Sequence, residues 1–264
     1  MPDIEDVQGR PERIRGMRIR VVTSCTAVKT VRDGRAVRME RIATELATSR
    51  VSPLAVPAED LYGGQQHLRL MRGVRRLREA PGAATLDLWI LSAKYGLIAG
   101  CTPLEPYDET FNGLPLDELR SRGEKLNIPR RAREVLAGTA DLVLVLLGED
   151  YLATCKFDAG LRLGSPTVFL CSRRASAGLP YVKGLRAVRL STSDTRRFHC
   201  GLISLKGEIA GRLLALLAAQ PKLLTALVDD RVDLLGLIQE QHIPPPFVDL
   251  HTGRRDTLAM PRLM

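Results

Sequence analysis

The sequence is poor in aromatic residues and lacks the common metal-binding motifs. Only 4% of its residues are Phe, Trp or Tyr, which argues against the broad stacking platform of a single-strand-binding protein. Its four histidines stand at positions 67, 199, 242 and 251 without H-E-x-x-H or paired Cys/His spacing. We therefore expect no catalytic metal ion and no cofactor.

Long apolar runs and paired cysteines are also missing. The five cysteines are an odd number and form no C-x-x-C pair, which argues against a disulfide framework. No run reaches the length of about 18 apolar residues that a transmembrane helix needs. The first residues mix acids with arginine and have no apolar centre, unlike a secretory signal. These features predict a cytoplasmic protein that does not bind a membrane.

Positive charge is plentiful. The 264 residues carry a formal net charge of +9, with 45% hydrophobic and 26% charged residues. This is the composition of a soluble globular protein. The excess of Lys and Arg favours a polyanionic partner. We expect this partner to be nucleic acid, and DNA rather than RNA. An arginine-rich, solvated surface is the alternative interpretation.

Apolar runs and helical patterns alternate along the chain. This alternation predicts a three-layer α/β/α fold with a mostly parallel central sheet. Strands are expected over 17–24, 86–91, 140–147, 166–171 and 184–190. Helices are expected over 35–47, 65–79, 115–123, 128–137, 149–161 and 201–219. Residues 1–16 would form a flexible arm, 17–220 the α/β domain, and 221–264 a C-terminal appendage with helices near 222–227 and 230–240.

Polar residues follow the predicted strands at the point where each strand ends. Parallel strands end at one edge of a sheet, where open α/β folds bind ligands. Three such loops should meet there, and a loop rich in carboxylates, 105–110, follows the middle one. The residues concerned are Ser24, Cys25 and Thr26; Ser92, Lys94 and Tyr95; and Gly148, Glu149 and Asp150.

Four short motifs occur in order within roughly residues 18–150. They are Ser24-Cys25-Thr26-x-x-Lys29, Asp60-Leu61-Tyr62, Leu91-Ser92-Ala93-Lys94-Tyr95-Gly96-Leu97 and Pro106-Tyr107-Asp108. Together they resemble a bacterial and phage family of uncharacterised function, often labelled YaaA-like. That resemblance implies a distant similarity to the uracil-DNA-glycosylase superfamily, with a base pocket at the strand ends. The superfamily's Gly-Gln-Asp-Pro and His-Pro-Ser motifs are missing, so its catalytic residues cannot be carried over by position.

Three residues are candidates for catalysis. Asp108 could activate water or stabilise a cationic sugar, although Asp also favours helix caps and turns. Lys94 could bind phosphate or act as an amine nucleophile. Tyr95 could stack on a base or donate its hydroxyl group, with core packing as the alternative.

Other residues are candidates for binding. The polar turn after the first strand would hold a phosphate, although Cys25 is also typical of a buried structural thiol. Asp60 and Glu149 could instead cap helices. The substrate-binding candidates are Ser24, Cys25, Thr26, Lys29, Asp60, Tyr62, Ser92, Gly96, Tyr107 and Glu149.

Arginines supply candidate contacts to a nucleic-acid backbone. One group shares a face of the helix expected over 65–79, and two pairs lie on predicted loops. A solvated surface would use them equally well. They are Arg69, Arg72, Arg76, Arg173, Arg174, Arg196 and Arg197.

These features lead to a hypothesis of an N-glycosidase that removes a modified or damaged base from nucleic acid. A role in phage defence or DNA modification would fit a family shared with phages. The alternative is a non-catalytic DNA-binding stress-response or accessory protein of YaaA-like type. An enzyme that acts on a free nucleoside or nucleotide is a third hypothesis.

Overall fold

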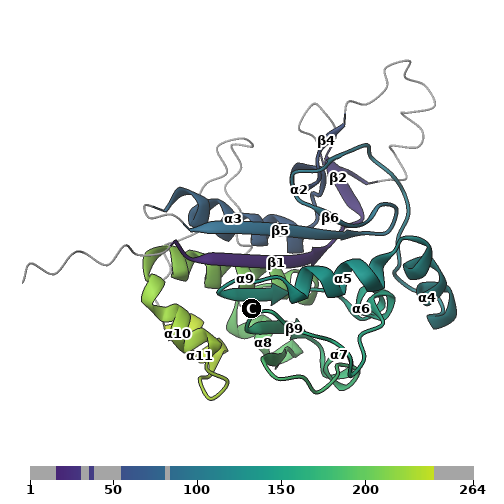
Figure 1. Ribbon diagram of the computed structural model, residues 1–264. Coiled ribbons are helices and arrows are strands. Elements are labelled where there is room, and N and C mark those ends of the chain that lie inside the picture. The colour runs from purple at the N-terminus through teal and green to yellow at the C-terminus, as the bar shows by residue number, and fades with distance from the viewer. Residues whose placement is uncertain (1–15, 31–35, 39–54, 81–83, 241–264) are drawn as a thin grey trace, which may run out of the picture.

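A six-stranded sheet forms the centre of the protein (Figure 1). The computed structural model describes residues 16–30, 36–38, 55–80 and 84–240. The strands run in the order β10 (Leu185–Arg189), β9 (Thr167–Cys171), β8 (Leu142–Val145), β1 (Arg18–Ser24), β5 (Thr85–Ser92) and β6 (Gly96–Ala99). All neighbours are parallel except β5 and β6, which pair antiparallel. The mostly parallel sheet expected from the sequence is confirmed.

Consecutive residues of β1 contact helices on opposite faces of this sheet. Val22 packs among Ala132 and Cys155, which belong to α5 (Ile128–Ala137) and α6 (Glu149–Cys155). The next residue, Thr23, accepts a hydrogen bond from Gln66, at the start of α3 (Gln65–Glu79). Side chains alternate across a strand, so the helices cover both faces and the three-layer α/β/α architecture is confirmed.

On the α3 face, glycines let two helices approach closely. α3 packs along α9 (Leu202–Ala219). A Cβ at Gly207 would lie 1.9 Å from the carbonyl oxygen of Gln66, and one at Gly73 would lie 2.2 Å from that of Gly211. Any larger residue would push the helices apart, so these glycines fix the distance between α3 and α9.

The region after Pro221 docks on the body of the protein. It contains a 3₁₀ turn (Pro221–Leu223), α10 (Leu224–Val228) and α11 (Leu234–Glu240). Leu227 and Ile238 are buried in the main core. The Arg186 guanidinium on β10 donates hydrogen bonds to the carbonyl oxygens of Leu227, Asp229 and Val232. Helices occur near both predicted positions, and the second begins later than expected. Residues 1–15 of the predicted arm 1–16, and residues 241–264 of the predicted appendage, lie outside the described residues.

Small elements gather at the carboxyl end of β1 and β5. They include the hairpin of β2 (Val28–Thr30) and β3 (Ala36–Arg38), the pair β4 (Val56–Pro57) and β7 (Pro103–Leu104), and helix α2 (Ala58–Leu61). Figure 1 shows β2, β4 and α2 together at the upper right, above the end of the sheet. Helix α4 (Leu116–Lys125) follows and packs against α6.

One sequence prediction in this region is wrong, and one strand was not predicted. The helix expected over 35–47 is contradicted at 36–38, where β3 pairs with β2. The rest of that range lies outside the described residues. The unpredicted strand is β6, which forms because Gly96 adopts a φ of +73° and turns the chain back along β5. That left-handed conformation suits glycine.

Helix ends account for three further corrections. The helix expected to reach residue 161 ends at Cys155, because Lys156 takes a left-handed conformation with φ 51°. The arginine pair at 173–174 is not in a loop but opens α7 (Arg173–Ala177), capped by Ser172. The pair at 196–197 closes α8 (Thr192–Arg197), which starts with a capping box of Ser191 and Asp194. Such caps satisfy free backbone N–H groups and favour short helices.

Candidate functional site

The predicted loops after β1, β5 and β8 meet at one edge of the sheet. The backbone N–H of Cys25, just after β1, donates to the carbonyl oxygen of Leu91 at 3.0 Å. The Cys25 Sγ lies 3.1 Å from the hydroxyl group of Tyr151, in the helix that follows β8. The chain leaves β1 toward β5 on one side, whereas β8 lies on its other side. This is the topological switch point where α/β sheets bind ligands.

Tyr107 is the centre of a buried hydrogen-bonded cluster at this edge. The Ser92 hydroxyl donates to the Tyr107 hydroxyl at 2.7 Å, and the Tyr62 hydroxyl lies 2.8 Å from the same oxygen. Ser92 Oγ accepts the backbone N–H groups of Lys94 and Tyr95 at 3.2 and 3.1 Å. Those two bonds leave its own hydrogen for Tyr107. Either hydroxyl group can be the donor between Tyr107 and Tyr62.

Lys29 reaches into this cluster from β2. It is 2% exposed, and its Nζ lies 4.4 Å from the centre of the Tyr107 ring. Burial lowers the pKa of Lys29, while the nearby Cys25, Asp108 and Glu109 act in the opposite direction. This burial favours a role inside the site over contact with a backbone phosphate.

The cluster tyrosines stay neutral. Burial raises the pKa of Tyr62, Tyr107 and Tyr151 well above the usual value of 10.0. The Tyr95 ring stands edge-on to the Tyr107 ring, with 5.4 Å between centres. The site therefore offers hydroxyl groups that can donate hydrogen bonds at neutral pH, together with aromatic edges and faces.

Charged side chains form an exposed rim beside the cluster, which we define as Lys94, Asp108 and Glu109. Lys94 Nζ lies 4.0 Å from Glu109 Oε1, and both side chains are more than 40% exposed. No helix within the described residues begins at Asp108, since the next one, α4, begins at Leu116. A helix-capping role is therefore excluded for Asp108, which is exposed and close enough to Lys29 to oppose the lowering of its pKa.

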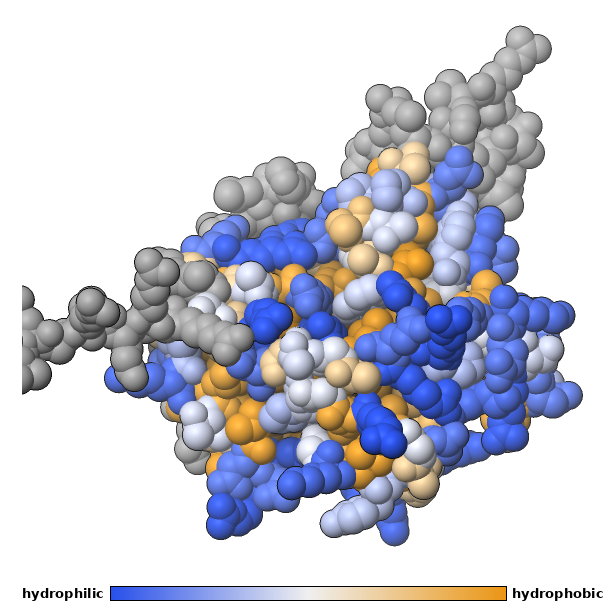
Figure 2. Space-filling view, in the orientation of Figure 1, coloured by the Kyte–Doolittle hydropathy of each residue, from blue (hydrophilic) through white to orange (hydrophobic). Residues whose placement is uncertain are grey.

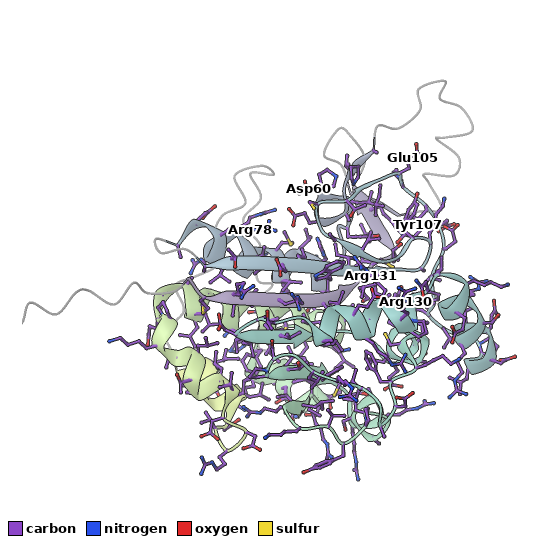
Figure 3. All side chains as sticks on the ribbon, viewed as in Figure 1. Asp60, Arg78, Glu105, Tyr107, Arg130 and Arg131 are labelled. Atoms are coloured by element: carbon purple, nitrogen blue, oxygen red, sulfur yellow. The ribbon has the colours of Figure 1, made fainter. Side chains whose placement is uncertain are left out.

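Several predicted site residues have evident structural contacts instead. Thr26 Oγ1 bridges the backbone of Val28 and Gly64, at 2.9 and 3.1 Å. A Cβ at Gly96 would lie 2.8 Å from the carbonyl oxygen of Leu126. Ser24 is buried at the end of β1. Asp60 is exposed on α2, and Figure 3 shows it apart from Tyr107.

Glu149 lies toward β9 rather than beside Tyr107. Its carboxylate accepts a 2.5 Å hydrogen bond from the Ser172 hydroxyl and lies 3.5 Å from Arg174 Nε. Nearby, Lys206 donates to the carbonyl oxygen of Leu147 at 2.7 Å, and burial lowers its pKa. These contacts join the ends of β8 and β9.

The candidate arginines are dispersed over the molecule. Arg69 forms a 2.5 Å ion pair with Glu208, which also binds Arg212, so it belongs to the α3–α9 interface. Arg72 and Arg76 are partly buried further along α3, whereas Arg173, Arg174 and Arg196 are exposed on α7 and α8. Arg197 donates to Gln239 of α11. Figure 2 shows that hydrophilic residues also gather over α4 and α5.

Sequence reasoning missed Tyr151, which contacts Cys25 and stands edge-on to Phe111. Its position could have indicated this role, because Tyr151 directly follows Gly148-Glu149-Asp150 and lies on the first turn of the helix after β8. Asp150 also contributes, because its carboxylate accepts the backbone N–H of Gly113 at 2.9 Å. These contacts attach the segment after Tyr107 to α6.

No group of three metal-ligating side chains occurs within the described part of the chain. Among the helices of those same residues, none is long and apolar enough to cross a membrane. All five cysteines are free thiols.

Comparison with known proteins adds no relative. No family model matches the chain, and no curated protein sequence matches it either. The resemblance to the YaaA-like family therefore stays a prediction.

Proposed function

We propose that this protein hydrolyses the N-glycosidic bond of a modified or damaged base in nucleic acid, and that this nucleic acid is DNA. The observation that carries this proposal is the hydrogen-bonded chain of Ser92, Tyr107 and Tyr62 beside Lys29, next to exposed carboxylates at the switch point of the sheet. Such a site combines neutral hydroxyl donors, a buried amine and carboxylates, which are the kinds of groups that this bond cleavage needs.

The tyrosines and Lys29 would act on the leaving base. As the bond breaks, negative charge develops on the base, and preorganised donors stabilise developing charge most effectively in a site that excludes water. The raised pKa of Tyr107 keeps its hydroxyl protonated and able to donate. Tyr95, which stands edge-on to Tyr107, would contact the face of the base.

The exposed rim would act on the sugar and its phosphate. Loss of the base leaves positive charge on the sugar, and a carboxylate stabilises such a cation or activates the attacking water. Asp108 has the right chemistry and is free of any helix cap. Lys94, whose amine lies at the solvent boundary, would bind the adjacent phosphate.

The surface would hold the nucleic acid while the base enters the site. Enzymes of this class extrude the target base from the stack. The net charge of +9 and the exposed Arg173, Arg174 and Arg196 favour binding that weakens with salt. The free thiols suit a cytoplasmic location, and removal of a modified base would suit DNA modification or phage defence.

A base-release assay with a matched pair of variants tests this function. The purified protein is incubated with DNA that contains normal, deaminated, hydroxymethylated or glucosylated bases, and free base is measured by mass spectrometry. Asp108→Asn should abolish release but keep DNA binding. The control, Asp117→Asn, changes an exposed aspartate on α4 and should release base at the wild-type rate.

Two other results would contradict the proposal. Release of base at the wild-type rate by Asp108→Asn would remove the carboxylate from the mechanism. Salt-sensitive binding with no release from any substrate would favour a DNA-binding protein without catalysis.

A further inference from the structure

We propose that Lys29 gives this protein a second activity, in which its amine forms an imine with the aldehyde of an abasic sugar and the strand is then cut by β-elimination. This inference rests on the proposed function, because removal of a base creates that aldehyde. It moves the nucleophilic amine from the exposed Lys94 to the buried Lys29.

The positions of the two lysines support this choice. Lys29 is 2% exposed and lies over the ring of Tyr107, with 4.4 Å from Nζ to the ring centre. The Lys94 side chain is 42% exposed and its amine lies near Glu109. The amine inside the base-binding cluster is therefore that of Lys29.

The surroundings of Lys29 also favour a reactive amine. Only the neutral amine is a nucleophile, and desolvation is a known way to obtain it. Burial lowers the pKa of Lys29, although Cys25, Asp108 and Glu109 oppose that effect. The other close groups, Tyr107 and Tyr62, remain neutral.

The proposed chemistry needs no oxidant or reductant. The Lys29 nitrogen attacks C1′ of the ring-opened sugar, and loss of water gives a protonated imine. A carboxylate, assigned here to Asp108, takes the proton from C2′, and that electron pair forms the C2′–C3′ double bond. The C3′–O bond breaks, and the phosphate leaves with its electrons. Water then attacks C1′ and releases an unsaturated aldehyde and the free amine.

Entry of the sugar requires a movement at the site. Lys29 is covered in the structure, so Tyr107 and the segment that follows it must shift to admit C1′. Residues 108–110 are exposed, whereas Phe111 and Gly113 hold the following residues to α6. The movement is therefore assigned to Tyr107 and residues 108–110. The adduct should therefore form more slowly than the protein binds DNA.

Reductive trapping on DNA with a pre-formed abasic site tests the role of Lys29 without any base release. With sodium cyanoborohydride, the wild-type chain should become covalently attached to the DNA, and peptide mapping should place the attachment on Lys29. Lys29→Met should lose the adduct. Lys222→Met should keep it, because Lys222 is exposed on the distant 3₁₀ turn.

The outcomes separate the two proposals. An adduct that maps to other lysines, survives in Lys29→Met or does not form at all would overturn the role of Lys29. Mapping on the wild-type chain decides the question even if Lys29→Met fails to fold. Base release from intact DNA is measured in a separate reaction, so release without a Lys29 adduct leaves the N-glycosidase proposal standing, and an adduct without release contradicts only that proposal.

Discussion

The Tyr107 hydroxyl lies 2.7 Å from Ser92 Oγ and 2.8 Å from the Tyr62 hydroxyl. This contact joins the end of β5, the segment after β7 and the residue after α2, which are separate elements in the sequence. Ser92 is 0%, Tyr62 1% and Tyr107 3% exposed, so water does not replace a hydrogen bond that is lost among the three hydroxyl groups. The same contact organises the candidate site and stabilises the fold around it.

Removal of the Tyr107 hydroxyl should therefore lower stability as well as activity. Tyr107→Phe leaves the Ser92 and Tyr62 hydroxyls buried without this partner, and such a loss costs about 1–3 kcal/mol. Chemical denaturation should show the decrease in the free energy of unfolding. Tyr181→Phe is the control, because Tyr181 is fully exposed and its change should have no measurable effect. Equal stability of the two variants would contradict the hydrogen-bonded cluster.

The α3–α9 contact should tolerate no side chain at its closest point. A Cβ at Gly207 would lie 1.9 Å from a backbone oxygen of Gln66, so Gly207→Ala should destabilise the protein by at least about 2 kcal/mol through forced separation of the helices. At Gly178 the nearest atom to an added Cβ is 3.6 Å away. Gly178→Ala should change the free energy of unfolding by less than about 0.5 kcal/mol. Thermal unfolding of both variants tests this difference.

Stability should fall as the pH drops below 6.5, the usual pKa of histidine. His67 is 1% exposed, and burial lowers its pKa in the folded state. Below pH 6.5 His67 binds a proton in the unfolded chain but stays neutral in the folded chain. The free energy of unfolding therefore decreases as the pH falls from 6.5 to the lowered pKa of the folded state. Above pH 6.5 both states are neutral and the effect disappears.

A pair of histidine variants checks this pH dependence. His67→Gln can still donate to the carbonyl oxygen of Glu59, which His67 Nε2 contacts at 2.8 Å, and it should show a weaker loss of stability between about pH 5 and 6.5. His199→Asn, a change at an exposed position, should behave like the wild type. An unchanged pH dependence in His67→Gln would show that other groups cause it.

Two arginines should respond to substitution in different ways. Arg173 is exposed on α7, so Arg173→Ala should weaken DNA binding and reduce the slope of log affinity against log salt by about one if it contacts a phosphate. Arg69 pairs with Glu208 at the α3–α9 interface, so Arg69→Ala should lower stability with little change in that slope. Binding measured at several salt concentrations, together with unfolding curves, separates the two roles.

Much of the sheet could be predicted from the sequence, whereas the burial of Lys29 could not. The strands β5, β8 and β9 appear as apolar runs because parallel strands are covered on both faces. Lys29 stands on a three-residue strand without such a pattern. It is buried because Tyr62 and Tyr107, distant in the sequence, fold around it. A local pattern contains no information about such contacts.

Within the site, the sequence indicated which strand ends meet but not which side chains face one another. The contact of Cys25 with Tyr151 depends on where α6 starts after β8. Glu149, only two residues earlier, faces Ser172 instead. A helix turns by about 100° per residue, so neighbouring residues at its start point to different sites.

A time course of free base released from the modified DNA substrates, with mass spectrometric detection, shows whether the Tyr107 cluster is a base-excision site. The wild-type protein and Asp117→Asn should release more than one equivalent of base from at least one substrate. Asp108→Asn should release none while it binds the same DNA. Absence of free base from every substrate, with salt-sensitive binding intact, would contradict the assignment of the Tyr107 cluster as a base-excision site.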